Sequence, residues 1–430
     1  MTYKETLDHL YSQLPMFSHT GSAAYKKDLH NTIAICESIG NPYTKYKTIH
    51  IAGTNGKGST SHMLAAILQE AGYKTGLYTS PHIKDFRERI RVNGNMISEQ
   101  FIIDFVARTQ DISDKVHPSF FELTVAMAFD YFAEEKVDIA VIETGLGGLL
   151  DSTNVISPIL TVITNISYDH QNILGNTLEE IAEQKAGIIK ENVPAVIGEV
   201  SKDLEEIFSK TAGNKNAELT FAGKRYSTEY IEPLGNILLC NIKDRETEIT
   251  EKLRLGLTGI YQAKNAVTVL AAVNELRKMN MEIPEAALHN GVEHVTALTG
   301  LRGRWEVLSN HPHIIADVGH NADGIKQLIL QLNTYYPLAR LHFVLGFVKD
   351  KNLDEALKYF PDNATYYFTN AHIPRALPFA ELQSKGLEFN LKGSGYDDVN
   401  AALNAAKLAA GNDDVILLCG SFFIISELES

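Results

Sequence analysis

Cysteine is scarce in this sequence, and its few occurrences are scattered. The chain has three cysteines, Cys36, Cys240 and Cys419, which are far apart and odd in number. A disulfide framework or a cysteine metal cage requires paired or clustered cysteines. We therefore expect reduced, buried thiols.

Positive charge is also in deficit, and long hydrophobic runs are missing. The chain has 39 Lys and Arg against 53 Asp and Glu, a formal net charge of −14. Broad binding to nucleic acid or anionic membranes requires positive charge, so we expect neither partner. No apolar run approaches the roughly 20 residues of a membrane span, and MTYKETLDHL at the start lacks the core of a secretory signal. We expect a cytoplasmic protein whose anionic substrate would need a local basic pocket.

The length of 430 residues exceeds what one hydrophobic core usually organises, so two domains are expected. Short apolar runs that end in small residues alternate with helical patterns in the first half. Continuous apolar strands of this kind are typical of a parallel sheet covered on both faces. The predicted strands are residues 48–53, 75–80, 138–145, 159–166 and 194–200.

The pattern changes after residue 214. Residues 215–257 indicate short antiparallel strands or an insertion, and a long helix is expected from about Tyr261 to Met279, with another starting at Pro284. Residues 296–306 are rich in glycine and predict a hinge. A second alternation follows, with strands at 313–318, 341–347, 365–371 and 414–420. We predict an α/β protein: a phosphate-loop ATPase domain with a parallel sheet (1–297), then a smaller Rossmann-like α/β domain (298–430).

The stretch TIHIAGTNGKGSTSHML, residues 48–64, passes from a predicted strand through a glycine-rich turn into a helical pattern. Glycines let backbone N–H groups approach phosphate oxygens, and a lysine at this position reaches the terminal phosphates. A glycine-rich turn without a ligand is the alternative. The predicted nucleotide-binding residues are Gly53, Thr54, Asn55, Gly56, Lys57, Gly58, Ser59 and Thr60.

This loop lacks the hydroxyl that normally follows the lysine and binds Mg²⁺, because Gly58 stands there. The missing oxygen must then come from a neighbouring strand end. The carboxyl ends of parallel strands open on the same side of a sheet, so Ser80 and Glu143 are the candidates. We expect Ser80 to replace the missing hydroxyl.

Seven ordered motifs carry a resemblance to a known family: GTNGKGST, YTSPHIKDFRERIRVNG, ETGLGGLLDSTN, YDHQNILGNTLEEIAEQKAGIIK, YQAKNA, GRWE and DVGHNADG. In this order they resemble the folylpolyglutamate synthase and dihydrofolate synthase family of the Mur ligase superfamily. The resemblance covers nearly the whole chain. It implies an ATP-dependent amide ligase with ATP bound between the two domains.

The resemblance also implies two Mg²⁺ sites, one held by Ser80 and Glu143 and a second involving His170. Taken alone, His170 would more often be an ordinary core or surface histidine, since Mg²⁺ prefers oxygen. The family also implies that Lys185 is carbamylated by CO₂, which turns a cation that the metals would repel into an anion. A solvated helix lysine is the alternative for Lys185.

In the second half, the resemblance places Asn265 against adenine and Arg304 on phosphate, as suits a planar guanidinium. Asp317 and His320 would face the glycine loop, and together with Lys57 and Lys185 they are the predicted catalytic residues. Without the family, Asp317 could equally be a helix cap.

The acid substrate is expected near the segment SFFE and the loop 147–151. An aromatic pair could stack on a flat pterin, although both rings could equally belong to the core. The arginines of KDFRERIR, spaced two apart, would share one face if extended and could receive a glutamate carboxylate, with solvated charge as the alternative. The predicted substrate-binding residues are Ser119, Phe120, Phe121, Glu122, Leu150, Asp151 and Arg89.

The implied reaction joins L-glutamate to dihydropteroate or a folate through an acyl phosphate made from ATP. We predict both activities in a monomer that binds only small-molecule partners. Three positions depart from the family pattern: Leu149 replaces an arginine, Tyr261 a histidine and Arg302 a proline. The alternatives are a Mur-type peptidoglycan-precursor ligase and a non-catalytic nucleotide switch.

Overall fold

The computed structural model describes residues 1–15 and 28–429, which divide into two compact units. The first unit contains the described residues up to Ser167, together with 171–257 and 262–301. The second contains residues 168–170 and 258–261 and everything described from Arg302 onward. Two short segments thus belong to the second unit although the sequence on both sides of them belongs to the first.

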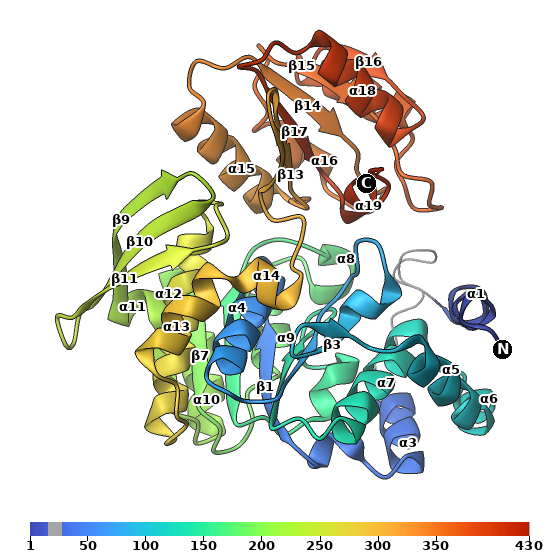
Figure 1. Cartoon of the computed structure of the whole chain (residues 1–430), viewed down its shortest axis with the longest axis vertical. Coiled ribbons are helices and arrows are strands. Elements are labelled where there is room, and N and C mark those ends of the chain that lie inside the picture. Colours follow the sequence, from blue (N-terminus) through green and yellow to red (C-terminus); the bar gives the residue numbers. More distant parts are fainter. Residues whose placement is uncertain (16–27, 430) are drawn as a thin grey trace. The chain divides into compact units, whose positions relative to one another are not determined.

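The first unit is built on an eight-stranded sheet with the order β4-β3-β2-β5-β1-β6-β7-β8. Strands β1, β3 and β7 of this sheet are labelled in Figure 1. The central strands are parallel and almost fully buried, as their uninterrupted apolar runs predict. Strands β3 and β4 form an antiparallel edge. The strands are β1 (Lys47–Ala52), β2 (Thr75–Tyr78), β3 (Ile90–Val92), β4 (Asn95–Met96), β5 (Ile139–Glu143), β6 (Leu160–Asn165), β7 (Ala195–Glu199) and β8 (Leu219–Phe221).

Helix α4 (Lys57–Glu70) starts directly after the glycine turn, and its side chains from Gly58 to Leu68 are all buried. A helix that is buried on every side lies inside a domain. The other helices that the structure describes in this unit are α1 (Tyr3–Gln13), α3 (His30–Ser38), α5 (Glu99–Arg108), α6 (Gln110–Val116), α7 (Phe120–Glu134), α8 (Gln171–Leu174), α9 (Leu178–Ala186), α10 (Glu205–Asn214), α11 (Ala222–Arg225), α12 (Gln262–Lys278), α13 (Glu285–Glu293) and α14 (Val295–Thr299). Four short 3₁₀ turns lie among the described residues of this unit: η2 (Pro42–Thr44), η3 (Phe86–Arg89), η4 (Ser152–Val155) and η5 (Lys202–Leu204).

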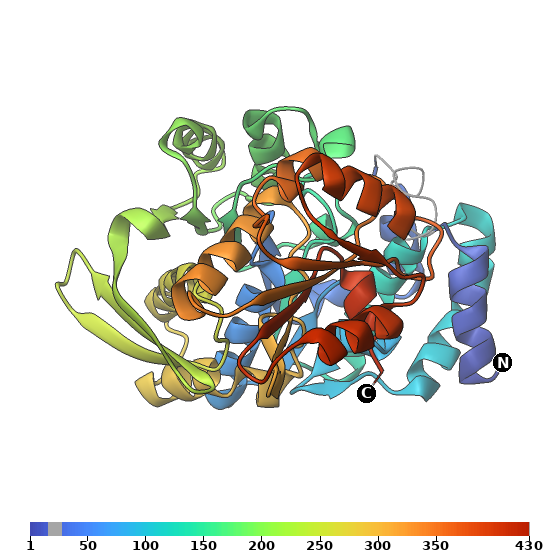
Figure 2. The same ribbon diagram turned by 90° about the horizontal axis from the view of Figure 1, so that it is seen from above.

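A three-stranded antiparallel sheet lies beside α12 and α13 and is coloured yellow-green in Figure 2. It consists of β9 (Tyr226–Leu234), β10 (Ile237–Asp244) and β11 (Thr250–Leu255), and every second residue of β10 is buried. The expectation of antiparallel strands within residues 215–257 is confirmed for β10 and β11, and β9 is an additional strand. The expectation is wrong for residues 217–223, because β8 joins the main sheet parallel to β7.

The second unit has a six-stranded sheet with the order β12-β13-β17-β14-β15-β16, in which only β12 is antiparallel to its neighbour. Side chains of α15 and α17 enter the same apolar cluster as Phe343 and Phe368 of the sheet. The elements are β12 (Glu306–Asn310), β13 (His313–Ala316), α15 (Ala322–Tyr335), β14 (Leu341–Leu345), α16 (Leu353–Leu357), β15 (Thr365–Phe368), α17 (Phe379–Glu388), β16 (Gly393–Gly395), α18 (Val399–Ala409), β17 (Val415–Cys419) and α19 (Phe422–Ser426).

The α/β class and the two alternations of strand and helix are confirmed. The predicted long helix corresponds to α12, whereas Pro284 is the N-cap of α13 and not its first helical residue. All three cysteines are free and buried, as expected. Among the helices that the structure describes, none combines the length and the apolar composition that a membrane crossing requires.

Candidate active site

The glycine turn between β1 and α4 has a backbone that requires glycine at two positions. Gly53 and Gly56 have φ angles of 149° and 85°. A Cβ on Gly53 would lie 1.9 Å from Thr164 Oγ1, and one on Gly56 would lie 2.3 Å from Asn265 Oδ1. A side chain at either position would clash with Thr164 of β6 or Asn265 of α12. Only glycine therefore lets the backbone of the turn lie this close to both elements.

The end of β6 braces the turn through hydrogen bonds. Thr54 N donates to the Asn165 carbonyl (3.0 Å), and Asn55 N donates to Asn165 Oδ1 (2.8 Å). Thr164 Oγ1 donates to the Asn55 carbonyl at 2.6 Å. Sequence reasoning missed Thr164 and Asn165, although polar residues at the end of a predicted parallel strand were the available signal.

Two lysines approach the same carbonyl oxygen in this turn. Lys57 Nζ donates to the carbonyls of Gly53 (3.1 Å) and Thr54 (3.2 Å), so its side chain folds back over the loop. Lys185, in the last turn of α9, is 2% exposed, and its Nζ donates to the Gly53 carbonyl at 2.8 Å. The two predicted catalytic lysines of this unit therefore meet at one oxygen.

The predicted metal ligands are Ser80, which follows β2, and Glu143, which ends β5. These two strands are neighbours, and β5 in turn pairs with β1. Ser80 N donates to Glu143 Oε2 at 3.3 Å, and the Glu143 carboxylate is buried. A carboxylate and a hydroxyl are oxygen ligands of the kind Mg²⁺ prefers. The residues present therefore fit Mg²⁺.

Helix α12 contributes two amides near the turn. Gln262 Nε2 donates to Ser59 Oγ at 3.1 Å, and Asn265 Nδ2 donates to Gln262 Oε1 at 2.8 Å. This chain of bonds aims Asn265 Oδ1 toward Gly56. The predicted adenine-contacting residue is thus brought to the glycine turn within the first unit.

The segment SFFE begins α7, and its polar residues form the helix cap. Ser119 Oγ accepts from Glu122 N (3.2 Å), while Ser119 N donates to Glu122 Oε2 (2.6 Å). Phe120 is 3% exposed and packs against Phe86. For Phe120 the core interpretation is therefore confirmed. Phe121 is half-buried, and its ring would lie 2.4 Å from a Cβ on Gly145.

The arginines of KDFRERIR do not form the common face that an extended segment would give, because part of the segment is the 3₁₀ turn η3. Arg87 pairs with Asp85, and Arg91 donates to the Gly94 carbonyl. Arg89 is buried, lies over the Phe120 ring at 5.2 Å and donates from Nε to His82 Nδ1. Burial lowers the pKa of His82 to about 3, so this ring is neutral and accepts the bond.

Asp317 lies at the end of β13 in the second unit, and its carboxylate has three donors. Trp305 N (2.7 Å) and the Tyr261 hydroxyl (2.5 Å) donate to Oδ2, and Gly319 N donates to Oδ1 (2.8 Å). Burial raises the pKa of Asp317, although these donors and nearby Arg304 oppose the rise. The helix-cap alternative for Asp317 is wrong, because Asn321 caps α15.

His320 and Arg304 lie in the same unit. The two ring nitrogens of His320 lie 2.9 Å from the Val318 carbonyl and 3.1 Å from Asp169 Oδ2. The Arg304 guanidinium lies over the Phe422 ring at 5.1 Å and donates to the Gly303 carbonyl. A flat guanidinium stacked in this way keeps its remaining donors oriented for an anion.

Asp169 and His170 belong to the short segment that joins the second unit. Burial would raise the pKa of Asp169, but Lys351 Nζ at 2.5 Å, with His170 and His320, holds it well below its usual range. Burial lowers the pKa of His170 to about 3, which leaves the neutral ring that a metal ligand requires. Lys351 was not predicted from the sequence, since a lysine between two polar residues gives no distinctive signal.

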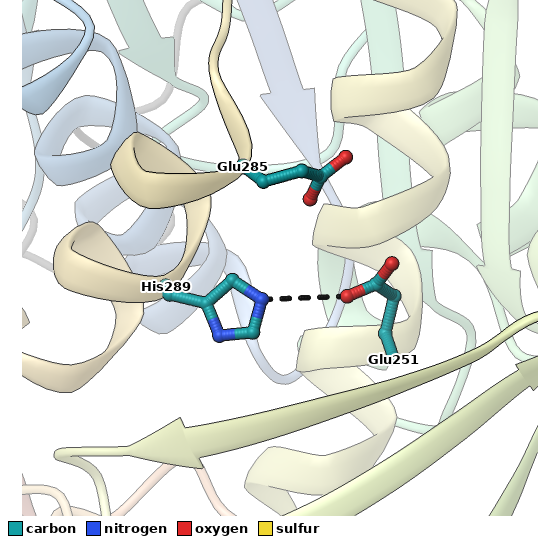
Figure 3. Close-up of side chains that lie close together, drawn as sticks. All are labelled: Glu251, Glu285 and His289. Carbon is teal, nitrogen blue, oxygen red and sulfur yellow. Dashed lines mark ion pairs between the residues drawn. The ribbon is translucent and has the colours of Figure 1, made fainter.

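A separate cluster on the first unit contains Glu251 of β11 with Glu285 and His289 of α13 (Figure 3). Their ligand atoms lie within 4.8 Å of one another, but each group already has an ion-pair partner. His289 Nε2 is 3.4 Å from Glu251 Oε2, and Arg277 Nη1 is 2.8 Å from Glu285 Oε1. We assign this cluster as an ion-pair network that joins β11 to α13.

A parallel sheet with a glycine turn, a lysine and acidic groups at adjacent strand ends, followed by a second α/β unit, defines the class of Mur ligases. Residues 51–273 match the Mur ligase middle domain, and residues 303–422 match the Mur ligase glutamate ligase domain. The chain belongs to the dihydrofolate synthase/folylpolyglutamate synthase family of these ATP-dependent ligases.

Three relatives illustrate the similarity. The dihydrofolate synthase/folylpolyglutamate synthase of Bacillus subtilis is 35% identical over 402 residues, which cover 91% of each chain. The structure of E. coli FolC in complex with DHPP and ADP has a TM-score of 0.85 at 28% identity and covers 99% of this chain and 96% of that one. The Mycobacterium tuberculosis folylpolyglutamate synthase complexed with ADP and AMPPCP has a TM-score of 0.87 at 28% identity, with 99% and 97% covered. Family membership favours ligation of glutamate to folates over the peptidoglycan and switch alternatives.

Proposed function

We propose that this chain is bifunctional and joins L-glutamate both to dihydropteroate and to folates, through an acyl phosphate. The substrate carboxylate attacks the γ-phosphorus of ATP and ADP leaves. The amine of glutamate then attacks the acyl carbon, and phosphate leaves as the amine loses its proton. The observation that supports this most directly is the glycine turn with Lys57 folded over it, beside Ser80 and Glu143.

Positioning and charge would supply most of the catalysis. In this proposal Lys57 binds the terminal phosphates, and backbone N–H groups of the glycine turn hold them. Arg304, Asp317 and His320 of the second unit are proposed to complete the nucleotide site with Asn265. No nucleophilic side chain is needed, because the substrate carboxylate is itself the nucleophile in the first step.

Ser80 and Glu143 would hold one Mg²⁺, and His170 would contribute to a second. Bound Mg²⁺ offsets the negative charge on the phosphate oxygens during transfer. Two oxygen ligands on adjacent strand ends would then compensate for Gly58 in the loop.

We further propose that Lys185 is carbamylated. Two ammonium groups, from Lys57 and Lys185, donate to the Gly53 carbonyl, and like charges this close disfavour each other. Reaction of the neutral Lys185 amine with CO₂ gives a carbamate and releases a proton, which replaces one of the two cations by an anion. A carbamate could also approach a divalent ion.

For the acid substrate, Phe121, Leu150, Asp151 and Arg89 remain the proposed contacts. Phe121 offers a half-buried ring beside Gly145, and Arg89 is a buried cation that lies over the ring of Phe120, the neighbour of Phe121. Ser119, Phe120 and Glu122 are proposed only as the helix start that presents Phe121. Cytoplasmic location and a monomeric state remain expectations.

A substrate panel tests the function. ADP release would be measured with dihydropteroate, dihydrofolate or tetrahydrofolate, each with ATP, Mg²⁺ and L-glutamate. We expect turnover with all three and none when glutamate is omitted. Lys57→Ala should abolish turnover, whereas Lys210→Ala, an exposed lysine on α10, should not. Turnover with dihydropteroate alone would contradict the bifunctional assignment, and slow hydrolysis independent of both acceptors would contradict ligation.

Carbamylation has its own test. Lys185→Ala should lower kcat by at least about a hundredfold, because a charged group at the transferring phosphate is lost. Removal of bicarbonate should slow the wild type, and added bicarbonate should restore it. Mass spectrometry after carbamate trapping should label Lys185. A wild type indifferent to bicarbonate and unlabelled at Lys185 would contradict the modification.

A further inference from the structure

Residues 303–305 of the second unit form a bend, which we call the Arg304 turn, whose backbone is strained at a tryptophan. Gly303 and Trp305 have φ angles of 70° and 51°, so both lie in the left-handed region. Glycine adopts this conformation without steric cost, whereas a bulky residue such as tryptophan rarely does. Backbone strain of this kind persists only where surrounding contacts hold it, and it is concentrated at functional sites. Arg304, the proposed phosphate ligand, lies between these two residues.

Hydrogen bonds hold the Arg304 turn at both ends. At its start, the N–H of buried Gly303 donates to Glu306 Oε2 (2.8 Å), and the Gly303 carbonyl accepts from Val318 N (3.0 Å). At its end, Trp305 N donates to Asp317 Oδ2 (2.7 Å), and the Trp305 ring is packed in the core of this unit. A buried backbone N–H requires an acceptor. The Glu306 side chain supplies the acceptor for Gly303.

Glu306 is the first residue of β12, and its other carboxylate oxygen is paired with a neighbouring cation. Arg302 Nε lies 2.9 Å from Glu306 Oε1, but the Arg302 side chain is 51% exposed. Ion pairs at the surface contribute little, whereas a hydrogen bond from a backbone N–H to a carboxylate is charge-assisted. We therefore expect the bond to Gly303, and not the ion pair, to carry the effect of Glu306.

The position of the Arg304 guanidinium depends on the same glycine. Arg304 Nη1 donates to the Gly303 carbonyl (3.2 Å), and the guanidinium lies over the Phe422 ring at 5.1 Å. Gly303 thus connects the Glu306 carboxylate, through its N–H, to the guanidinium, through its carbonyl. A shift of Gly303 would move the acceptor on which Arg304 rests.

We propose that Glu306 is a positioning residue for Arg304. Its carboxylate holds the start of the strained turn, and the turn fixes the guanidinium for a phosphate oxygen. The role in nucleotide binding rests on the proposed function, which assigns Arg304 to phosphate. The role of Glu306 in holding the turn does not.

Calorimetric titration with AMPPCP and Mg²⁺ tests the effect on nucleotide binding. Glu306→Leu should weaken the affinity about tenfold, the factor expected for the loss of one hydrogen bond to a charged group. Glu306→Gln keeps an acceptor oxygen for Gly303 and should lose less than about threefold. Arg302→Gln removes only the ion pair, and Glu388→Leu removes a carboxylate of α17 that is paired with Lys385, so both should stay within about twofold of the wild type.

A double-mutant cycle separates positioning from a general loss of structure. If Glu306 acts through Arg304, Glu306→Leu should weaken AMPPCP binding about tenfold in the wild type and by less than about twofold in the Arg304→Met background. Equal losses in the two backgrounds, or no loss in the wild type, would overturn the positioning role.

Hydrogen exchange without nucleotide tests how the turn is held. In Glu306→Leu the Gly303 amide should exchange roughly tenfold faster than in the wild type, while the amides of α15 stay unchanged. Unchanged exchange at Gly303 would overturn the proposal even if the ligase activity is confirmed. Faster exchange at Gly303 in a chain whose wild type binds no AMPPCP would retain the role in holding the turn and refute the nucleotide site.

Discussion

At the scale of single residues, Tyr261 contacts a buried carboxylate from a position where the family resemblance predicts histidine. Here the Tyr261 hydroxyl donates to Asp317 at 2.5 Å, and that bond lowers the pKa of a carboxyl group that burial raises. Loss of the hydroxyl should therefore raise the pKa of Asp317 further.

Tyr261→Phe should lower kcat/KM about tenfold or more, because a hydrogen bond to a charged group is lost. It should also move the acid limb of the pH profile to higher pH, since Asp317 would be protonated earlier. Tyr261→His should recover part of the activity. A tenfold loss with an unmoved acid limb would show that the tyrosine acts only through packing.

His50 gives a prediction for the pH dependence of stability. Burial, with a smaller effect of Lys190, lowers its pKa in the folded chain from about 6.5 to about 3. Below pH 6.5 the unfolded chain therefore binds a proton that the folded chain does not. Stability from this residue is complete above pH 6.5 and is lost progressively as the pH falls toward 3.

Between pH 7.5 and pH 5 this histidine should cost about 2 kcal/mol of stability, from about 1.4 kcal/mol per pH unit below 6.5. Urea unfolding of the wild type and of His50→Gln at both pH values measures the difference. The pH-dependent loss should be about 2 kcal/mol smaller in His50→Gln, whereas His294→Gln, at an exposed histidine, should behave as the wild type. Equal losses in wild type and His50→Gln would contradict the assignment.

At the scale of elements, the sequence predicted strands better than it predicted how polar side chains are used. The runs at 138–145 and 414–420 became β5 and β17 because uninterrupted apolar strands can only be buried between helices. The bonds of Ser119, Asp151 and Asp317 depend on backbone groups that only the folded chain brings together. For this reason the role of Ser119 as a helix cap and that of Asp317 as an acceptor of three hydrogen bonds could not be derived from spacing.

Gly56, the residue before helix α4, offers a test of why the turn requires glycine. Gly56 and Gly72 flank this helix, and both have positive φ angles, 85° and 90°. A Cβ on Gly72 would meet nothing within 4 Å, whereas one on Gly56 would meet Asn265 Oδ1 at 2.3 Å. The two positions share the backbone strain and differ only in the contact.

Gly72→Ala should therefore lower stability by about 1 kcal/mol, the cost of a left-handed residue, and leave ADP binding unchanged. Gly56→Ala should add the clash with Asn265 and weaken ADP binding at least tenfold. Thermal unfolding and calorimetric titration with Mg²⁺ and ADP measure both effects. Equal ADP affinity in the two variants would show that the turn tolerates a side chain and is no phosphate site.

At the scale of the whole molecule, each unit has a hydrophobic core of its own, and the chain passes repeatedly from one unit to the other. The proposed nucleotide ligands are also divided: Lys57 and Asn265 belong to the first unit, Arg304 and Asp317 to the second. We therefore expect a nucleotide that is held by both sets of residues to protect backbone amides in both units from hydrogen exchange.

A saturating non-hydrolysable ATP analogue with Mg²⁺ should slow hydrogen exchange in the glycine turn and also around residues 303–320, because a ligand that binds the folded state protects whatever it contacts. Arg304→Met should retain the protection at the glycine turn and lose most of it around 303–320, since the guanidinium is the proposed link to phosphate. Arg340→Met removes an exposed arginine from the same unit and should leave both regions protected. Protection confined to the first unit in the wild type, at full occupancy, would mean that the second unit does not bind the nucleotide, and the roles given to Arg304 and Asp317 would then be wrong.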